Sequence, residues 1–361
     1  MSAAMLRNAS APVASALERF ETEFIASLDA AESAGHPALK ASRLLSGKRL
    51  RPLLHLLAQG AADPERPPEP GAAVLIELLH IASLLHDDVV DGTDRRRGLK
   101  SLNAAEGNRF SVLSGDYLMA KALSLALGFP DPIVTPALSR ALLVMTAAEL
   151  KQALSGGAAV VSESEVLEIA YGKTACLMET ACELGGRLAG ADEGRVRALG
   201  RFGRHFGLAY QIRDDIQDVT GDSKTLGKPV GQDASGGRWT LPLVYSLEAS
   251  GAADRKACMR RMARRTAADV AWIHAFILRH GGAEAAERKV DAELGEGVRQ
   301  LSGFPESDCR SGLILLCGRP AFGRTGTAPG QEKDAPEQLP DPERNSAHTG
   351  FGTLRCAGEG L

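Results

Sequence analysis

Acidic residues repeat one spacing at two places in the chain. The pattern D-D-x-x-D occurs as Asp87, Asp88 and Asp91 and again as Asp214, Asp215 and Asp218. Each copy comes after an apolar run typical of a buried helix. On a helix, residues i and i+4 share one face, so these like charges repel unless a cation neutralises them. Carboxylate oxygens suit Mg²⁺, which usually keeps waters and substrate phosphates as further ligands. The repeated spacing therefore predicts two helix ends that bind Mg²⁺ together.

Basic residues accompany the first acidic group. Three arginines at positions 95–97 come directly after it, and fixed positive charge of this kind binds phosphate oxygens. A second basic segment places Lys48 and Arg51 three residues apart, which would put them on one helix face. Either group alone could be a solvated charged surface. Together, the acidic and basic groups indicate a site for metal and phosphate.

Composition narrows the class of protein. The chain has 361 residues, 4% of them aromatic, and no long stretch alternates as a strand does. We therefore expect an all-α protein. A formal net charge of −3 argues against nonspecific binding of nucleic acid, which needs a broad basic field. Six cysteines form no C-x-x-C pair, which favours a reduced, cytoplasmic protein.

Three motifs, in this order and spacing, carry a resemblance to a known family. GKRLRP at 47–52, LLHDDVVD at 84–91 with RRRG at 95–98, and QIRDDIQD at 211–218 resemble the trans-polyprenyl diphosphate synthase family. The likeness covers roughly residues 10–304. It implies an all-α, single-domain bundle of about ten or more helices around a central cavity, the isoprenoid synthase type. We expect this domain at 1–304 and an atypical, largely disordered tail at 305–361, where the composition cannot bury a core.

The resemblance also implies roles for individual residues. Metal would be held by Asp87, Asp91 and Asp214, binding three Mg²⁺ ions with their acidic neighbours, and Lys173 would join the catalytic group. The diphosphate of isopentenyl diphosphate would be held by Lys48, Arg51, His80 and Arg97. The allylic diphosphate would contact Arg96, Lys173 and Thr174. Further substrate contacts are expected from Gln211, Lys228 and Arg238, although the family has a lysine where Arg238 stands.

Small residues precede the first acidic group on its helix. In the family, bulky aromatic residues at the positions of Ala82 and Ser83 stop the product at short lengths, so this sequence resembles the long-chain branch. The implied product is an all-trans polyprenyl diphosphate of C40–C50, a precursor of quinone side chains. A chain of that length would outrun a helix of ordinary length, which rises about 1.5 Å per residue.

The implied reaction is a repeated prenyl transfer. Diphosphate leaves an allylic substrate, isopentenyl diphosphate attacks the resulting cation, and a proton is then lost. Alternatives are a short-chain synthase making farnesyl or geranylgeranyl diphosphate and a metal-dependent phosphohydrolase, which the adjacent His86 and Asp87 could mark. A noncatalytic subunit and a terpene cyclase are less compatible with two intact acidic groups and a second basic site.

The sequence also bears on partners and location. The first 30 residues lack the long apolar core of a signal peptide, and no run of about 18 apolar residues predicts a membrane span. We expect isopentenyl and allylic diphosphates as small-molecule partners and peripheral membrane contact for product release. The family commonly forms homodimers, so a homodimer is expected here.

Overall fold

The structure, a computed structural model, describes residues 2–32, 47–96, 99–154, 161–221 and 230–318. The chain divides into two units, Met1–Phe322 and Gly323–Leu361, and every described element belongs to the first. Apart from one antiparallel ribbon of β1 (Arg95–Arg96) and β2 (Leu99–Lys100), the regular structure of these residues is helical. The expected all-α class is therefore confirmed.

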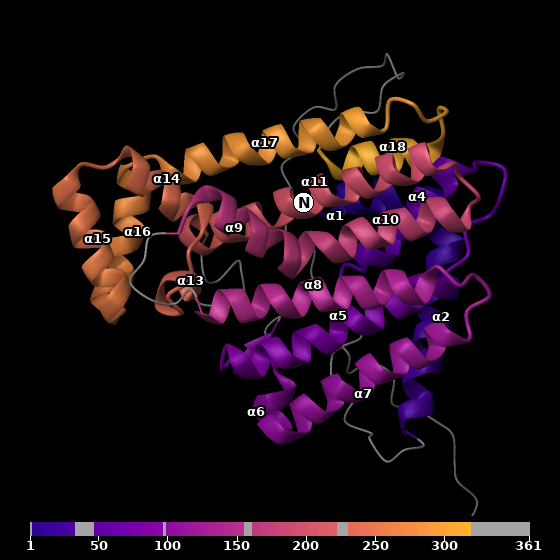
Figure 1. Cartoon of the computed structure of the whole chain (residues 1–361), viewed down its shortest axis with the longest axis horizontal. Helices are drawn as coiled ribbons and strands as arrows, with labels where there is room; N and C mark the ends of the chain where they lie inside the picture. Colours follow the sequence, from indigo (N-terminus) through magenta and orange to yellow (C-terminus); the bar gives the residue numbers. More distant parts are fainter. Residues whose placement is uncertain (1, 33–46, 97–98, 155–160, 222–229, 319–361) are drawn as a thin grey trace, which may run out of the picture. The chain divides into compact units, whose positions relative to one another are not determined.

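The helices of the described residues are labelled in chain order in Figure 1. In the first half they are α1 (Ala3–Ser10), η1 (Ala11–Val13), α2 (Ala14–Glu32), α4 (Leu50–Ala62), α5 (Gly71–Val90), α6 (Leu102–Glu106), α7 (Asn108–Leu127) and α8 (Val134–Leu154). In the second half they are α9 (Glu163–Ala170), the π-helix η3 (Tyr171–Ala175), α10 (Cys176–Leu188), α11 (Glu193–Thr220), α13 (Gln232–Ser235), α14 (Leu241–Ala249), α15 (Ala252–Arg264), α16 (Ala267–Arg279), α17 (Gly282–Gln300) and α18 (Asp308–Leu316).

Long helices lie side by side through the middle of the unit. Each neighbouring pair in the series α5, α8, α10, α11, α17 is in contact, and Figure 1 shows them running in nearly one direction. The α5 helix is buried over most of its length and also packs against α7. A helix that is apolar nearly all round is stable only inside such a layer. This packing holds the first acidic group at the C-terminal end of α5.

Glycines bring α11 close to the helix before it. A Cβ atom on Gly203 would lie 2.5 Å from the carbonyl oxygen of Met178, and one on Gly207 would lie 2.5 Å from the Cα of Ala175. No other residue fits such distances without a shift of the backbone. The close approach sets α11, which carries the second acidic group, directly against η3.

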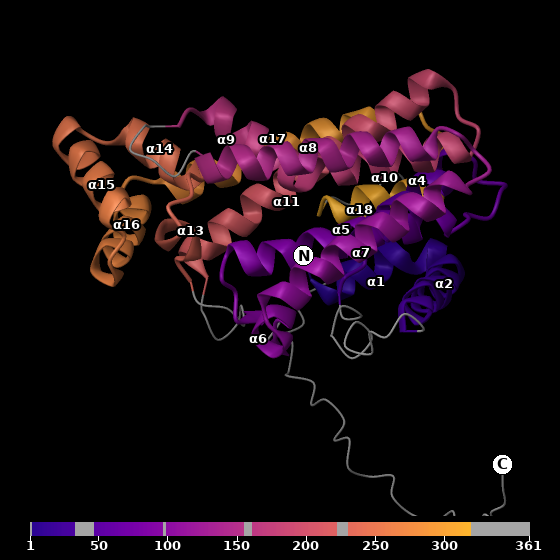
Figure 2. The same ribbon diagram turned by 60° about the horizontal axis from the view of Figure 1, so that its bottom comes forward.

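The short helix α13 fixes the last residue of the second acidic group. Asp218 accepts hydrogen bonds from the backbone N–H groups of Gln232 (3.2 Å) and Asp233 (3.0 Å), so it caps α13. Figure 2 shows α13 between the end of α11 and α16, and both helices contact it. The chain beyond α11 thus returns to the same end of the unit as Asp218.

The helical packing continues beyond residue 304, where the sequence predicted the domain to end. In α18, Leu313, Ile314 and Leu316 are buried against a core that includes α4, and the helix also packs on α1. Ser307 caps the helix by accepting from the N–H of Arg310. The cap and the short apolar run of Leu313–Leu316 place α18 against this core. The rest of the expected tail, from residue 319, lies outside the described residues.

One described helix, α7, is long and apolar enough by length and composition to cross a membrane. About a third of its apolar stretch (33%) is buried inside the protein. A buried helix in the core of a protein outside the membrane can meet the same criteria of length and composition. The sequence predicted no such segment, because polar residues interrupt the apolar residues of α7. The helix meets the criterion only through its mean hydropathy of 1.2.

Candidate active site

A cavity of about 400 Å³ lies among α5, η3, α11 and the loop that leads to α14. Its walls include many of the residues expected from the sequence: Arg51, His80, Ser83, Asp87, Asp91, Arg96, Lys173, Thr174, Gln211, Asp214, Asp215, Asp218 and Arg238. They come from segments more than one hundred residues apart. The two acidic groups therefore face one hollow, as their shared spacing predicted.

The first acidic group divides between two environments. Asp87 and Asp91 line the cavity. Burial raises the pKa of Asp87 to about 6, while Lys173 acts in the opposite direction. Asp88 is 3% exposed and is not part of the cavity wall. It accepts two hydrogen bonds from Arg96, at 2.9 and 2.6 Å. Asp88 thus orients an arginine rather than facing the cavity.

The second acidic group is held in a hydrogen-bonded chain. The Thr174 hydroxyl donates to Gln211 at 2.6 Å, and the Gln211 amide donates to Asp215 at 2.8 Å. Burial, with Asp233 next, raises the pKa of Asp215 well above its ordinary value. Carboxyl groups crowded and buried in this way favour a bound cation or a proton.

Cations stand between the two acidic groups. Arg238 donates to Asp91 and to Asp233, both at 2.9 Å, and so joins the two walls of the cavity. Lys173 lies 2.9 Å from Glu149. Burial lowers the pKa of Lys173, but Glu149 and Asp87 outweigh it and leave that pKa raised. Both cations therefore stay charged at the place where an anionic substrate would enter.

A π-helix presents Lys173 and Thr174. Such single turns are rare and often occur at functional sites. Gly172 lets this turn lie close to α8, because a Cβ there would lie 2.4 Å from the Cβ of Ala148. The turn rotates Lys173 toward the first acidic group and Thr174 toward Gln211.

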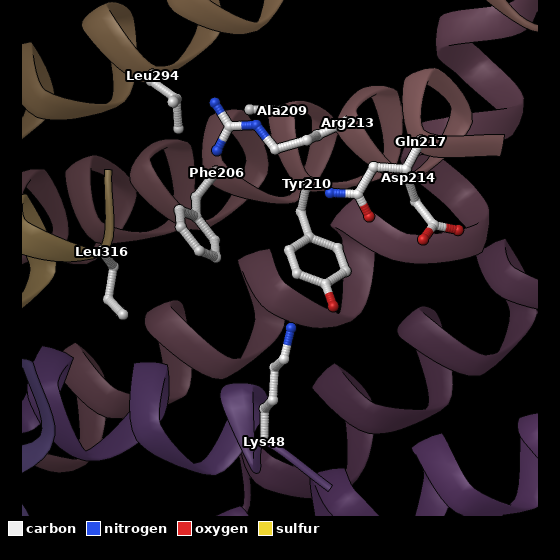
Figure 3. Close-up of a pocket in the computed structure, with 9 residues that line it drawn as sticks. All are labelled: Lys48, Phe206, Ala209, Tyr210, Arg213, Asp214, Gln217, Leu294 and Leu316. Atoms are coloured by element: carbon white, nitrogen blue, oxygen red, sulfur yellow. The ribbon is translucent and has the colours of Figure 1, made fainter. Parts of the chain in front are cut away.

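Lys48 does not share a helix face with Arg51, so that sequence prediction is wrong. The α4 helix begins only at Leu50, after Arg49 adopts a left-handed conformation with φ of 45°. Lys48 instead lines a smaller cavity of about 100 Å³ with Phe206, Ala209, Tyr210, Arg213, Asp214, Gln217, Leu294 and Leu316. Figure 3 shows its ammonium group turned toward the Tyr210 side chain. Tyr210 and Asp214 line both cavities, whereas Lys48 lines only the smaller one and Arg51 only the larger one.

Other predicted residues lie elsewhere. Ala82 is fully buried in the core cluster that includes Leu118, and it is not part of the cavity wall, whereas Ser83 is. Arg97 and Lys228 lie outside the described residues. The sequence reasoning missed Asp233 and Tyr210. An acidic residue in a glycine-bounded loop, and an aromatic residue directly before Gln211, were the available signals.

The profile of the Polyprenyl synthetase family matches residues 37–277, more than half of the chain. The chain belongs to this family. The match includes both acidic groups and the basic segment before α4, so the resemblance drawn from the motifs is confirmed. A prenyltransferase activity of the trans-polyprenyl diphosphate synthase type goes with membership.

Relatives of the family match most of the chain. An octaprenyl diphosphate synthase of Haemophilus influenzae is 34% identical over 274 residues, which is 75% of this chain and 82% of that protein. An all-trans-nonaprenyl-diphosphate synthase (geranyl-diphosphate specific) of Rhodobacter capsulatus is 35% identical over 271 residues, 75% of this chain and 83% of that protein.

A solved polyprenyl synthase has the same fold. The enzyme from Caulobacter crescentus, complexed with calcium and isoprenyl diphosphate, superposes with a TM-score of 0.78 at 31% identity. The match covers 88% of this chain and 96% of that one. The expected isoprenoid synthase type of bundle is therefore confirmed.

The donor set of the cavity fits the divalent ion that this family generally uses. Among the described residues no three His, Cys, Asp or Glu side chains converge as a ready-made metal site. The carboxylates instead face one another across the cavity, and several are buried, as the raised pKa values of Asp87 and Asp215 reflect. Oxygen ligands on two walls suit Mg²⁺ when a substrate diphosphate supplies the remaining oxygens.

Proposed function

We propose that this chain condenses isopentenyl diphosphate repeatedly with an allylic diphosphate to give a long all-trans polyprenyl diphosphate of C40–C50, a precursor of quinone side chains. The observation that carries the proposal is the single cavity lined by both acidic groups and by Arg51, His80 and Ser83. The long-chain names of the relatives from Haemophilus and Rhodobacter support the product length.

Two subsites divide the cavity wall in this proposal. The allylic diphosphate would lie between Arg96, Lys173 and Arg238, close to the acidic groups. Asp87, Asp91 and Asp214 would hold three Mg²⁺ ions, which supply positive charge against the leaving diphosphate. Isopentenyl diphosphate would be bound by Arg51 and His80 in the main cavity and by Lys48 in the smaller cavity. Arg97 and Lys228 are further expected contacts.

The chemistry needs little from side chains beyond position and charge. The allylic C–O bond breaks, C4 of isopentenyl diphosphate bonds to the allylic carbon, and the cation left on C3 becomes a double bond when a proton leaves C2. No described side chain lies where a base is obvious, so we assign the proton to the departed diphosphate. Leu84, Val166 and Ile169 line the cavity and exclude water from the cation.

Product analysis tests the proposal. The enzyme is incubated with farnesyl diphosphate, isopentenyl diphosphate and Mg²⁺, and the prenyl products are sized by chromatography. We expect C40–C50 products, and Asp87→Asn should lower kcat/KM by roughly 10²–10³-fold. Asp291→Asn, on an exposed face of α17, is the control. Products of C15 or C20 would favour a short-chain synthase. Phosphate release without consumption of isopentenyl diphosphate would favour a phosphohydrolase.

We also propose a homodimer formed through α7 and α8. Most of the exposed large apolar residues of the described chain lie on these two helices: Val112, Leu113, Leu125, Leu127, Leu143, Leu150 and Leu154. On α8, Leu143, Leu150 and Leu154 form one stripe, because they are spaced by seven and four residues. A second copy offers the same stripe and so a self-complementary surface.

We propose further that the protein works in a reducing cytoplasm and touches a membrane to release its product. Cys176, Cys182, Cys258 and Cys309 are free thiols, which is compatible with a reducing compartment. A C40–C50 chain on a diphosphate is amphiphilic, so a lipid surface is a reasonable destination. Fractionation of cells that express the protein would test both statements.

A further inference from the structure

Arg49 is held in a backbone conformation that side chains seldom adopt. Its φ of 45° is left-handed, and Arg265 is the only other non-glycine residue with positive φ in the described part of the chain. Residues in this region persist only where their surroundings hold them firmly. Arg49 is also the residue at which the chain turns into α4. The conformation therefore decides where Lys48 and Arg51, on either side of it, are directed.

Buried contacts hold the Arg49 side chain. Its Nη1 donates to Glu77 at 2.9 Å, and its Nε donates to Glu21 at 2.8 Å. The guanidinium also lies 4.6 Å from the ring centre of Phe24. Arg49 is 9% exposed. Charge-assisted hydrogen bonds in such a dry setting are strong and directional. The arginine is thus clamped between α2 and α5.

Glu77 links this clamp to the cavity. It is 4% exposed and precedes His80 by three residues on α5. Its Oε2 and the Nε of Arg51 are both buried without a hydrogen-bond partner among the described residues. Burial lowers the pKa of Arg51, and the charge of Glu77 opposes this more than any other group. One carboxylate therefore bonds to Arg49 and also stabilises the charge of Arg51.

We propose that Arg49 and Glu77 are positioning residues for the diphosphate of isopentenyl diphosphate. Their ion pair fixes the left-handed turn that directs Lys48 to the smaller cavity and Arg51 into the main cavity, while Glu77 keeps Arg51 in place. The inference rests on the proposed function. Neither residue lines either of these two cavities, so both act through their neighbours.

Kinetics of Arg49→Gly and Glu77→Gln test this role. Glycine adopts φ of 45° without strain, so Arg49→Gly removes the clamp and leaves the turn possible. We expect each variant to raise KM for isopentenyl diphosphate about tenfold or more and to leave KM for farnesyl diphosphate within twofold. Arg49→Lys keeps the positive charge but cannot contact Glu21 and Glu77 with the same geometry. It should therefore raise KM for isopentenyl diphosphate less than Arg49→Gly does. A folded Arg49→Gly enzyme with unchanged KM values, or with both KM values raised equally, would overturn the proposal.

Arg265→Gly is the matched control, because it changes the other left-handed arginine and should leave both KM values unchanged. Thermal unfolding of every variant identifies any loss of fold. Consumption of isopentenyl diphosphate by the unaltered enzyme tests the proposed function separately from the clamp. If that reaction is absent, calorimetry with inorganic diphosphate and no metal still tests the clamp. Binding at least tenfold weaker in Arg49→Gly supports it, and equal binding contradicts it.

Discussion

At the residue scale, the surroundings of each charged group decide its task. Asp88 and Asp91 are three residues apart and chemically identical, yet Asp88 is buried on Arg96 while Asp91 lines the cavity beside Arg238. Arg238 in turn spans two carboxylates, which a shorter, single-point lysine could not do in the same way. The Arg238 guanidinium therefore connects the acidic walls of the cavity.

His55 makes stability depend on pH in a way that can be measured. It is fully buried on α4, where Nδ1 lies 2.9 Å from the Ala181 carbonyl and Nε2 lies 2.8 Å from the Gln59 amide. Nδ1 then donates and Nε2 accepts, so the neutral ring satisfies both contacts. Burial lowers its pKa from 6.5 to about 4, although the bond to Ala181 opposes this.

Between pH 6.5 and 4 the unfolded chain therefore binds a proton at His55 that the folded protein does not. The free energy of unfolding should fall as pH drops through this window, by up to about 3 kcal/mol from this group. Asp87, whose pKa is raised, acts in the opposite sense, so the comparison must be with a variant. Urea unfolding of His55→Gln should show a weaker loss than the unaltered protein. Parallel pH dependences would contradict the assignment.

At the element scale, neighbouring positions on α5 have different neighbours. Ser83 lines the cavity and donates to the His80 carbonyl at 2.8 Å. Ala82 points into the core that contains Leu118 and Ala122 of α7. Successive residues on a helix are about 100° apart, and here that rotation turns Ser83 to the cavity while Ala82 packs in the core. Substitutions at Ser83 should therefore affect product length, whereas substitutions at Ala82 should affect core packing.

Substitution by phenylalanine should separate them. Ser83→Phe narrows the cavity and should shorten the main product, with little loss of stability. Ala82→Phe overpacks the core and should lower the free energy of unfolding by about 1–3 kcal/mol. Product chromatography and thermal unfolding measure the two effects. Ser302→Phe, at an exposed turn, is the control. An unchanged product from Ser83→Phe would show that the chain grows elsewhere.

The α18 helix should contribute to stability, because its apolar side packs into the core. Leu313 is completely buried against the core formed with α4. Leu313→Ala should lower the free energy of unfolding by about 2–5 kcal/mol, because it leaves a cavity. Leu315→Ala, at a half-buried position of the same helix, should cost less. Equal, small effects in equilibrium unfolding would show that α18 is not part of the cooperative unit.

At the scale of the whole molecule, the exposed apolar face of α7 and α8 is the surface that we propose for dimer formation. Exposed large apolar residues that gather on neighbouring elements of a protein often mark an interaction site. On α7 the face includes Leu113 and Leu127, which are 14 residues apart and so on nearly the same side, and on α8 it includes Leu143 and Leu150. The proposed dimer would account for the apolar character of α7, with one face in the core and another at a subunit boundary.

Charge on this face should break the dimer. Light scattering after gel filtration should give twice the mass of one chain for the unaltered protein. Leu143→Glu combined with Leu150→Glu should give a monomer, because each copy would bury two unpaired carboxylates. Leu278→Glu, exposed on α16, is the control and should leave the dimer intact. A dimer that survives the double change would place the boundary on another surface.

The sequence by itself determined the class of fold and the chemistry of the site. Helical periodicity is local, and the repeated D-D-x-x-D spacing fixes which carboxylates share a face wherever the helix lies. The basic segments before α4 and after α5 carried the rest of the resemblance. These features needed no knowledge of distant contacts.

Only the tertiary structure decided which of those charged groups line a cavity and which are buried against other side chains. Lys48 and Arg51 were expected on one face, but the left-handed turn at Arg49 puts them in different cavities. The surroundings of Asp88 and Ala82 and the partners of Arg238 were settled by segments far away in the chain. The reason is physical: spacing fixes directions within one helix, whereas burial and pairing depend on which other helix packs against it.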